Sequence, residues 1–284
     1  MTGIIDIGSN TLRLVLYEKN KKIKNIAVGS EILSDTKDAI LSHEGIEKLC
    51  KTITYFCEKS EGARIFAFAT YALRTLENKE EVKRIVFEET GVKIDILSGE
   101  DEAKYDFYGL LGSISKKEEG IGVDLGGGSA QIFVFKNEEI RFCSSYPIGC
   151  KRLKNRFVQG KFPTQSEEGK LREYIKEKLS SLVGTCQKKI FMMGGTAKTA
   201  IKLYSYLKGT ENRDTLDVEN LYEIIRFIKE TPEEAMKNIL KYRYDNIVVG
   251  IIIMEEIAKI VGADKIHIKK CGVRDGYLLK KEEN

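Results

Sequence analysis

A short pattern occurs twice along the chain, first at residues 5–10 and again at residues 123–128. In each copy an apolar run leads into Asp-x-Gly, small residues follow, and apolar positions then alternate with others. This order predicts a strand, a tight turn and a second strand. Because the whole unit recurs, the sequence predicts two similar lobes.

More strands and helices are predicted after each hairpin. They cover residues 24–28 (strand), 43–58 (helix) and 64–69 (strand) in the first half, and 140–146 (strand), 168–182 (helix) and 189–193 (strand) in the second. Strands that alternate with helices predict central sheets covered on both faces. The polar segment 113–120 separates the halves, so we expect domains at 1–116 and 117–284. The charged composition of residues 280–284 predicts a frayed tail.

Composition narrows the class of protein. A chain of 284 residues with 42% apolar residues has enough material for two folded domains. The net charge of +4 is too small to indicate a nucleic-acid surface, and the longest uncharged apolar stretch, 247–254, is too short to span a membrane. No signal peptide is evident at residues 3–17. Six cysteines without a C-x-x-C pair and only two histidines indicate reduced thiols and no zinc site, hence a cytoplasmic protein.

The two turns have the residues that phosphate binding needs. Small residues after a strand let backbone N–H groups approach phosphate oxygens closely. The candidates are Gly8, Ser9 and Asn10 in the first turn, Gly126, Gly127, Gly128 and Ser129 in the second, and Gly194, Gly195 and Thr196, which open a helix after a strand. One such motif alone is equally typical of an ordinary hairpin, but two matching copies favour phosphate. Asp6 and Asp124 end the preceding strands and suit Mg²⁺, or Mn²⁺ in its place.

Six motifs in a fixed order resemble the exopolyphosphatase and guanosine pentaphosphate phosphohydrolase family. They are residues 6–10 (DIGSN), 69–74 (ATYALR), 97–104 (LSGEDEAK), 124–129 (DLGGGS), 147–149 (PIG) and 272–276 (GVRDG). The resemblance implies an α/β fold of the two-lobed actin, hexokinase and Hsp70-like (ribonuclease H-like) type, with duplicated mixed sheets flanked by helices. The chain looks like a short form without the C-terminal helical extension of larger members.

The resemblance also implies roles for single residues. Glu102 stands where the family has the glutamate thought to activate the attacking water. Without the resemblance, its acidic neighbours would also fit a solvated helix turn, but the match favours the catalytic role. Asp124 matches the metal-associated aspartate, and Asp6 the aspartate of the first phosphate turn. Arg74 matches an arginine of the family that looks placed to contact phosphate. Arg13 is a weaker candidate for the same role.

Two departures from the family pattern bear on activity. Gln131 replaces a glutamate often linked to metal binding, so an uncharged amide stands where a carboxylate is usual. The stretch 242–245 keeps the arginine and the aspartate of the family but not the acidic residue before that arginine. Magnesium affinity and turnover therefore become questions for experiment.

The leading interpretation is an exopolyphosphatase that releases terminal orthophosphate from inorganic polyphosphate in a cleft between the lobes, with Mg²⁺ and a water oriented by Glu102. Guanosine pentaphosphate is the alternative substrate and would connect the chain with the stringent response. A binding protein or sensor with little turnover, and an ATP-dependent kinase of the same fold, remain open. The basic run at 151–156 fits either a polyanion track or a solvated helix face, and helices at 218–229 and 247–260 fit either core or the face of a homodimer.

Overall fold

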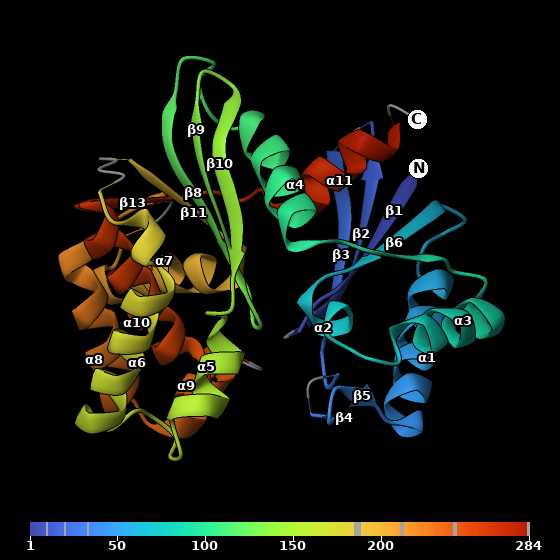
Figure 1. The fold of residues 1–284 in the computed structure, drawn as a ribbon, viewed down its shortest axis with the longest axis horizontal. Coiled ribbons are helices and arrows are strands. Elements are labelled where there is room, and N and C mark those ends of the chain that lie inside the picture. Colours follow the sequence, from blue (N-terminus) through green and yellow to red (C-terminus); the bar gives the residue numbers. More distant parts are fainter. Residues whose placement is uncertain are drawn as a thin grey trace. The chain divides into compact units, whose positions relative to one another are not determined.

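The computed structural model describes residues 1–9, 11–19, 21–32, 34–184, 189–210, 213–240 and 243–282. These residues form two compact units, Met1–Asp101 and Glu102–Asn284 (Figure 1). The division lies inside helix α4 (Gly99–Leu111), whereas the sequence suggests a boundary after this helix. The functional division at 116/117 stays a prediction.

The first unit contains a five-stranded mixed sheet with the strand order β3-β2-β1-β6-β7. β1 pairs antiparallel with β2 and parallel with β6, and β6 pairs parallel with β7. The elements are β1 (Thr2–Ile7), β2 (Thr11–Glu18), β3 (Lys21–Gly29), β4 (Thr36–Lys37), β5 (Ile40–Leu41), α1 (His43–Glu58), β6 (Arg64–Ala69), α2 (Tyr71–Arg74), α3 (Lys79–Thr90) and β7 (Ile94–Ile96).

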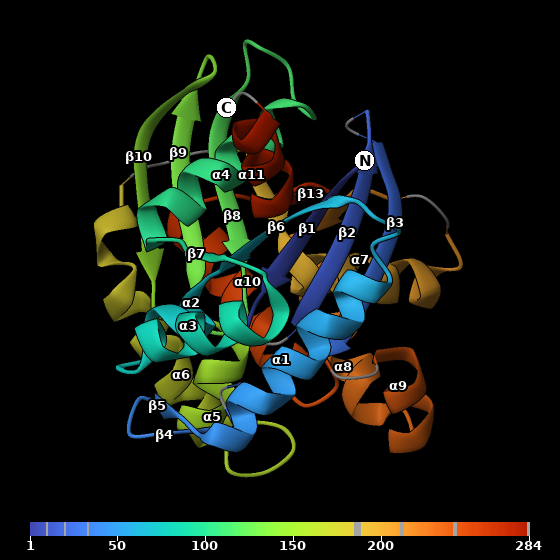
Figure 2. The ribbon, with the colours of Figure 1, turned by 90° about the vertical axis from the view of Figure 1, so that its right-hand side faces the viewer.

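Helix α1 shows why the first unit folds as the sequence predicts. It begins at Ser42, whose hydroxyl accepts a hydrogen bond from the backbone N–H of Gly45 at 3.1 Å. Its buried residues recur at helical spacing, and Ile53 and Phe56 are fully buried. Helices α1 and α3 lie together over one face of the sheet (Figure 2) and share one apolar core with it.

The second unit contains a six-stranded mixed sheet with the strand order β10-β9-β8-β11-β13-β12. β8 pairs antiparallel with β9 and parallel with β11, as β1 does with β2 and β6. Its elements after α4 are β8 (Glu119–Leu125), β9 (Ala130–Lys136), β10 (Glu139–Tyr146), α5 (Cys150–Phe157), α6 (Gln165–Lys178), η1 (Ser180–Leu182), β11 (Ile190–Met193), α7 (Gly194–Lys208), β12 (Thr215–Asp217), η2 (Val218–Asn220), α8 (Leu221–Glu230), α9 (Glu233–Leu240), α10 (Ile247–Val261), β13 (Lys265–Ile268) and α11 (Val273–Glu282).

Both faces of the second sheet are covered, as the alternation of strands and helices predicts. Alternate strand residues separate onto two cores because successive side chains point to opposite faces. Ile121, Val123 and Ile132 join the large core of helices α5 to α10. Phe133 and Phe135 face the other way and pack against Phe107 and Leu110 of α4.

Three local predictions need correction. The helix expected over 168–182 ends at Lys178 and continues as the 3₁₀ turn η1, and the helix expected over 218–229 divides into η2 and α8. The expected frayed tail is wrong for residues 280–282, because α11 continues to Glu282. Lys280 and Lys281 lie in its last turn, where positive charge stabilises a helix end.

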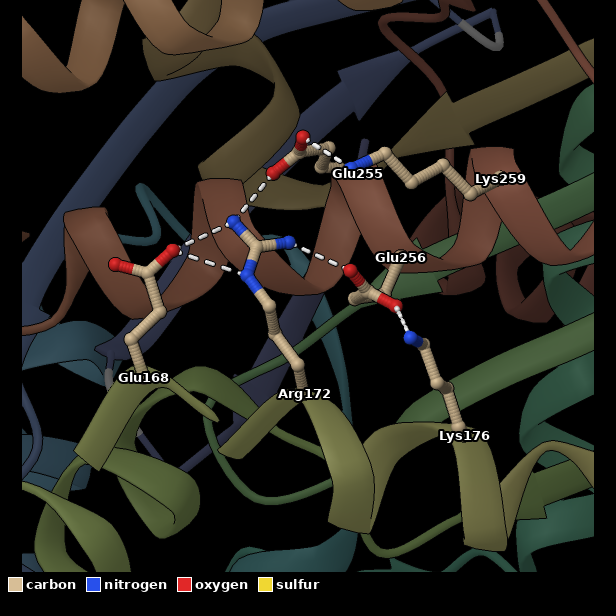
Figure 3. Close-up of polar contacts among 6 residues, drawn as sticks. All are labelled: Glu168, Arg172, Lys176, Glu255, Glu256 and Lys259. Atoms are coloured by element: carbon tan, nitrogen blue, oxygen red, sulfur yellow. Dashed lines mark hydrogen bonds and ion pairs between the residues drawn. The ribbon is translucent and has the colours of Figure 1, made fainter. Parts of the chain in front are cut away.

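Helix α10 is core rather than an exposed face, which decides one alternative left open by the sequence. Its residues from Ile247 to Met254 are all buried. In its second half Glu256 is buried to 2% exposure and accepts a hydrogen bond from Arg172 of α6 at 2.6 Å. Arg172 also bonds Glu168 and Glu255 (Figure 3), so one guanidinium joins three carboxylates across two helices. None of the described helices is long and apolar enough to cross a membrane.

Candidate active site

In the first unit the parallel strands β1, β6 and β7 bring several sequence motifs to one edge of the sheet. The N–H of Thr70, just after β6, donates to the carbonyl of Ile7 at 3.4 Å, and the N–H of Leu97, just after β7, donates to Ala69 at 2.9 Å. Parallel strands end at the same edge, where ligands of open α/β sheets bind. Residues 6–9, the motif at 69–74 and the first residues of the motif at 97–104 therefore meet within this unit.

The first turn contains buried polar groups without protein partners. The N–H of Gly8 donates to the carbonyl of Thr11 at 3.2 Å and closes the turn. Ser9 is only 4% exposed, and its Oγ, like Oγ1 of Thr11, has no hydrogen-bond partner among the described residues. Asn10 lies outside the described residues. A buried hydroxyl without a partner is costly, so a bound phosphate would satisfy groups that the fold leaves unpaired.

The two candidate arginines have different surroundings. Arg13 of β2 stands opposite Asp6 in the strand register, and its Nη1 donates to Oδ1 of Asn25 at 2.8 Å. Arg74, at the end of α2, donates from Nη1 to the carbonyl of Leu97 at 3.0 Å. This contact uses one of the five donors of the guanidinium and ties α2 to the segment that leads into α4.

The second turn repeats the first. The N–H of Gly126 donates to the carbonyl of Ser129 at 3.0 Å, as Gly8 does to Thr11. The carbonyl of Gly126 accepts from the N–H of Cys150 at 3.0 Å, in the first turn of α5. A Cβ at Gly149 would lie 2.4 Å from the carbonyl oxygen of Gly127. Glycine at position 149 is therefore what lets α5 dock on the turn and hold it from its carbonyl side.

The third glycine motif begins helix α7. Gly194 has a φ of +84°, and a Cβ there would lie 2.3 Å from Oδ1 of Asp124. A Cβ at Gly195 would lie 2.0 Å from Nη2 of Arg243, so this guanidinium covers the start of the helix. Thr196 is buried, and its hydroxyl donates to Sγ of Cys150 at 3.8 Å. Its side chain is thus engaged in the core, and a phosphate contact stays a prediction for its backbone N–H.

Three acidic side chains gather in the second unit. Glu102 and Asp106 lie one helical turn apart on α4 and are 7% and 0% exposed. Oδ1 of Asp106 and Oδ2 of Asp124 both lie 3.6 Å from the Cβ position that Gly272 leaves empty. Burial, followed by the negative charges of Asp124 and Glu102, raises the pKa of Asp106 well above its ordinary value. This environment therefore favours the protonated form of Asp106 over the charged one.

Sequence analysis singled out neither Asp106 nor Arg243 as a site residue. The signal for Asp106 was its spacing of four from Glu102, which places both carboxyls on one helix face. Arg243 belongs to a family stretch, but its position beside Gly195 comes from the fold alone. Neither carboxyl oxygen of Asp106 forms a well-aligned hydrogen bond with a described residue. The carboxyl group of Asp124 is nevertheless close enough to share a proton with Asp106, and this contact contributes to the raised pKa of Asp106.

Aromatic packing fixes α4 and its acidic face. The rings of Phe107 and Phe133 are 5.7 Å apart in an edge-to-face arrangement, and Phe107 also lies 5.7 Å from Phe135. On helix α11, a Cβ at Gly276 would lie 2.0 Å from the carbonyl oxygen of Tyr105 of α4. This close approach of α11 and the packing on β9 together hold Glu102 and Asp106 in place.

The carboxylates suit a cation that keeps part of its water shell. No group of three His, Cys, Asp or Glu side chains in the described ranges could enclose a metal ion. Mg²⁺ usually binds through one or two carboxylates together with water and substrate phosphate. Because Gly194 has no side chain, Oδ1 of Asp124 can lie close to the start of α7, and the Asp124 side chain is only half-buried. Asp124 thus fits an open magnesium site, and Asp6, 9% exposed, fits a second contact in its own unit.

Duplicated Asp-x-Gly turns, a glycine turn at a helix start and a buried glutamate define a phosphate-processing protein. The sequence model of the Ppx/GppA phosphatase family matches residues 13–284, and the chain belongs to this family. Similar proteins include exopolyphosphatase 1 of Mycobacterium tuberculosis, 26% identical over 300 residues that cover 98% of this chain and 87% of that protein. Family and relatives together indicate a phosphoanhydride hydrolase.

Other comparisons concern length and fold. The bifunctional 3-dehydroquinate synthase/phosphatase of Fusobacterium nucleatum is 28% identical over 99% of this chain, but the chain spans only 46% of its length. An exopolyphosphatase structure from Cytophaga hutchinsonii has a TM-score of 0.89 at 19% identity, covering 99% and 97% of the two chains. The Aquifex aeolicus family member has a TM-score of 0.80 at 24% identity, covering 100% and 98%. The predicted fold class is confirmed.

Proposed function

We propose that the chain is an exopolyphosphatase that removes the terminal orthophosphate from inorganic polyphosphate. The observation that carries the proposal is the combination, within one unit, of the glycine turn at 126–129 with the buried carboxyl group of Glu102 and the half-buried one of Asp124. The turn offers backbone donors to a phosphoryl group, and Glu102 offers a base beside it. Exopolyphosphatase relatives support polyphosphate as the substrate.

In the proposed reaction water attacks the terminal phosphorus while the P–O bond to the next phosphate breaks. Glu102 accepts the proton of the attacking water, and the shortened polyphosphate leaves with the bridging oxygen. Backbone N–H groups of the second turn stabilise the equatorial oxygens, and the first turn and the guanidinium of Arg74 are the candidate phosphate ligands of the first unit. Asp124 in the second unit and Asp6 in the first are the candidate ligands for Mg²⁺, which would offset phosphate charge when bound; Mn²⁺ has the same ligand preference.

The raised pKa of Asp106 has a role in this scheme. Three ionised carboxylates next to a phosphate turn would repel a polyanion, and the raised pKa of Asp106 favours the neutral acid, which removes one of these charges. Glu102 and Asp124 are the two carboxylates that the proposed reaction uses. Burial of Asp106 at 0% exposure is the largest cause of its raised pKa.

Guanosine pentaphosphate is the second candidate substrate, because hydrolysis of its terminal phosphate requires the same groups. A binding or sensing role is favoured by one observation, the amide of Gln131 directly opposite Asp124 in the strand register. An amide binds Mg²⁺ less strongly than a carboxylate, which would lower turnover. A homodimer and a cytoplasmic location are part of the proposal and await measurement.

The test is phosphate release from polyphosphate, guanosine pentaphosphate and ATP, with Mg²⁺ and with excess EDTA. Glu102→Gln should lower kcat by about 10²- to 10⁴-fold, because the water loses its general base. Glu100→Gln, an exposed residue of the same helix, is the matched control and should keep wild-type kcat. Equal activity of both variants contradicts the role of Glu102, and binding without phosphate release would favour the sensing role.

A further inference from the structure

Gln131 is the centre of a small buried hydrogen-bond network on the second sheet. The side chain is 1% exposed, and its Nε2 donates to Oγ of Ser129 at 2.9 Å and to Oγ of Ser145 at 2.8 Å. Gln131 of β9 stands opposite Asp124 of β8 and Ser145 of β10 in the register. These side chains share one face of the sheet, because residues opposite one another on neighbouring strands point the same way.

The network fixes the direction of the Ser129 hydroxyl. An amide group has two N–H donors, and both are used on the two serines. A hydroxyl that accepts a hydrogen bond keeps one proton of its own to donate. For Ser129, 4% exposed, the described residues provide no acceptor for that proton. Since Ser129 ends the glycine turn at 126–128, an anion held by the turn is the acceptor that the arrangement lacks.

We propose that Gln131 orients the Ser129 hydroxyl as a fixed donor to the phosphate at the second turn, so that this turn retains phosphate without a divalent cation. The inference rests on the proposed function, because it takes the second turn as a phosphate site. Gln131 acts through Ser129 and is thus a positioning residue.

The role depends on the donor character of the amide. A carboxylate at position 131 has no protons to donate, so it would accept the proton of Ser129 and withdraw that donor from the phosphate. It would also place a second negative charge opposite Asp124, which favours a cation and disfavours an anion. Gln131 therefore shifts the turn from binding metal toward binding phosphate directly.

The test is a double-mutant cycle on the full chain, with tripolyphosphate as the probe, excess EDTA and titration calorimetry as the readout. Ser129→Ala and Gln131→Glu should each raise Kd about tenfold or more, because a hydrogen bond to a charged group is lost. The double variant should bind no more than about threefold more weakly than Gln131→Glu alone. Ser145→Ala is the matched control and should stay within about threefold of wild type, since Gln131 still bonds Ser129.

Three results would overturn the inference: no binding by the wild type in EDTA, an unchanged Kd for Ser129→Ala, or losses that simply multiply in the double variant. Multiplied losses would mean that Gln131→Glu acts only through its added charge. If Gln131→Glu does not fold, Gln131→Leu takes its place in the cycle. The increase in Kd caused by Ser129→Ala should then be at least about threefold smaller in the Gln131→Leu background than in wild type. An unchanged effect of Ser129→Ala contradicts the inference.

Phosphate release from polyphosphate with Mg²⁺, measured on the same preparations, separates this inference from the proposed function. A coupled cycle in a protein that releases no phosphate supports the role of Gln131 and contradicts the hydrolase. A protein that hydrolyses polyphosphate but shows multiplied losses contradicts only the role of Gln131.

Discussion

Arg172→Met is expected to destabilise the second unit strongly, because it removes the only cation bonded to three carboxylates at once in the network of Figure 3. Glu256 matters most, since it is 2% exposed and its bond to Arg172 measures 2.6 Å. Leaving a buried charge without its partner costs about 3–5 kcal/mol. Lys176 stays 3.8 Å from Glu256 and softens the loss, so we expect the lower limit of about 3 kcal/mol.

For a unit of this size, about 3 kcal/mol corresponds to a decrease in Tm of about 6–12 °C. Calorimetry or circular dichroism on the full chain measures it. Arg226→Met is the matched control, because Arg226 pairs with Glu230 on exposed helix surface at 4.0 Å and should shift Tm by less than about 2 °C. The double variant Arg172→Met/Glu256→Leu should recover most of the loss, since no buried charge remains.

The same network predicts a pH dependence. Burial alone would raise the pKa of Glu255, but hydrogen bonds from Lys259 and Arg172 outweigh it and lower the pKa below the ordinary 4.5. The stability that Glu255 provides is therefore present above pH 4.5 and is lost as pH falls through its folded pKa. The gap in Tm between wild type and Arg172→Met should narrow in that range. A gap below about 2 °C at pH 7, or a double variant as unstable as the single one, would refute the reasoning.

Three further results are expected. Asp106→Asn should equal wild type in Tm below pH 3.8 and exceed it at pH 8. The raised pKa of Asp106 means that its stabilising contribution is complete below pH 3.8 and is lost as pH rises; a Tm series over pH checks this. Gly149→Ala should lose about 1–3 kcal/mol in urea unfolding together with polyphosphate binding, because its methyl group meets the backbone of Gly127 at 2.4 Å. A Cβ at Gly169 would have no atom within 4 Å beyond its chain neighbours and the backbone of its own helix, so Gly169→Ala should instead raise the free energy of unfolding by up to about 1 kcal/mol and leave binding unchanged. Equal effects of the two substitutions would contradict the docking of α5 on the turn.

Much of the fold was predictable from the sequence because its signals are local. The repeat of Asp-x-Gly with alternating apolar residues predicts two hairpins, and the structure confirms both, with Gly8 and Gly126 closing equivalent turns. Helix α1 begins and ends at the predicted residues 43 and 58. Local propensity fails at helix ends such as Glu282, where the polar composition of the tail indicated fraying.

The candidate site was only partly predictable. Glycines and aspartates of the turns have local signatures, and their roles still rest on the family resemblance and await the tests above. The raised pKa of Asp106 could not be predicted, because it depends on burial and on the charge of Asp124, which is distant in the sequence. Arg243 was missed as a site residue for the same reason: only the fold brings it to Gly195.

By itself the sequence determined the order of strands, turns and helices, the duplication, and the residue types available for phosphate and metal. Those properties follow from periodicity and backbone preference over a few neighbouring residues. Tertiary structure decided which pKa values shift and which groups are paired or oriented: the raised pKa of Asp106, the shared Arg172 and the donor direction at Ser129. Electrostatics and hydrogen bonding depend on separations of a few ångströms between segments far apart in the chain, and only the folded chain sets those separations.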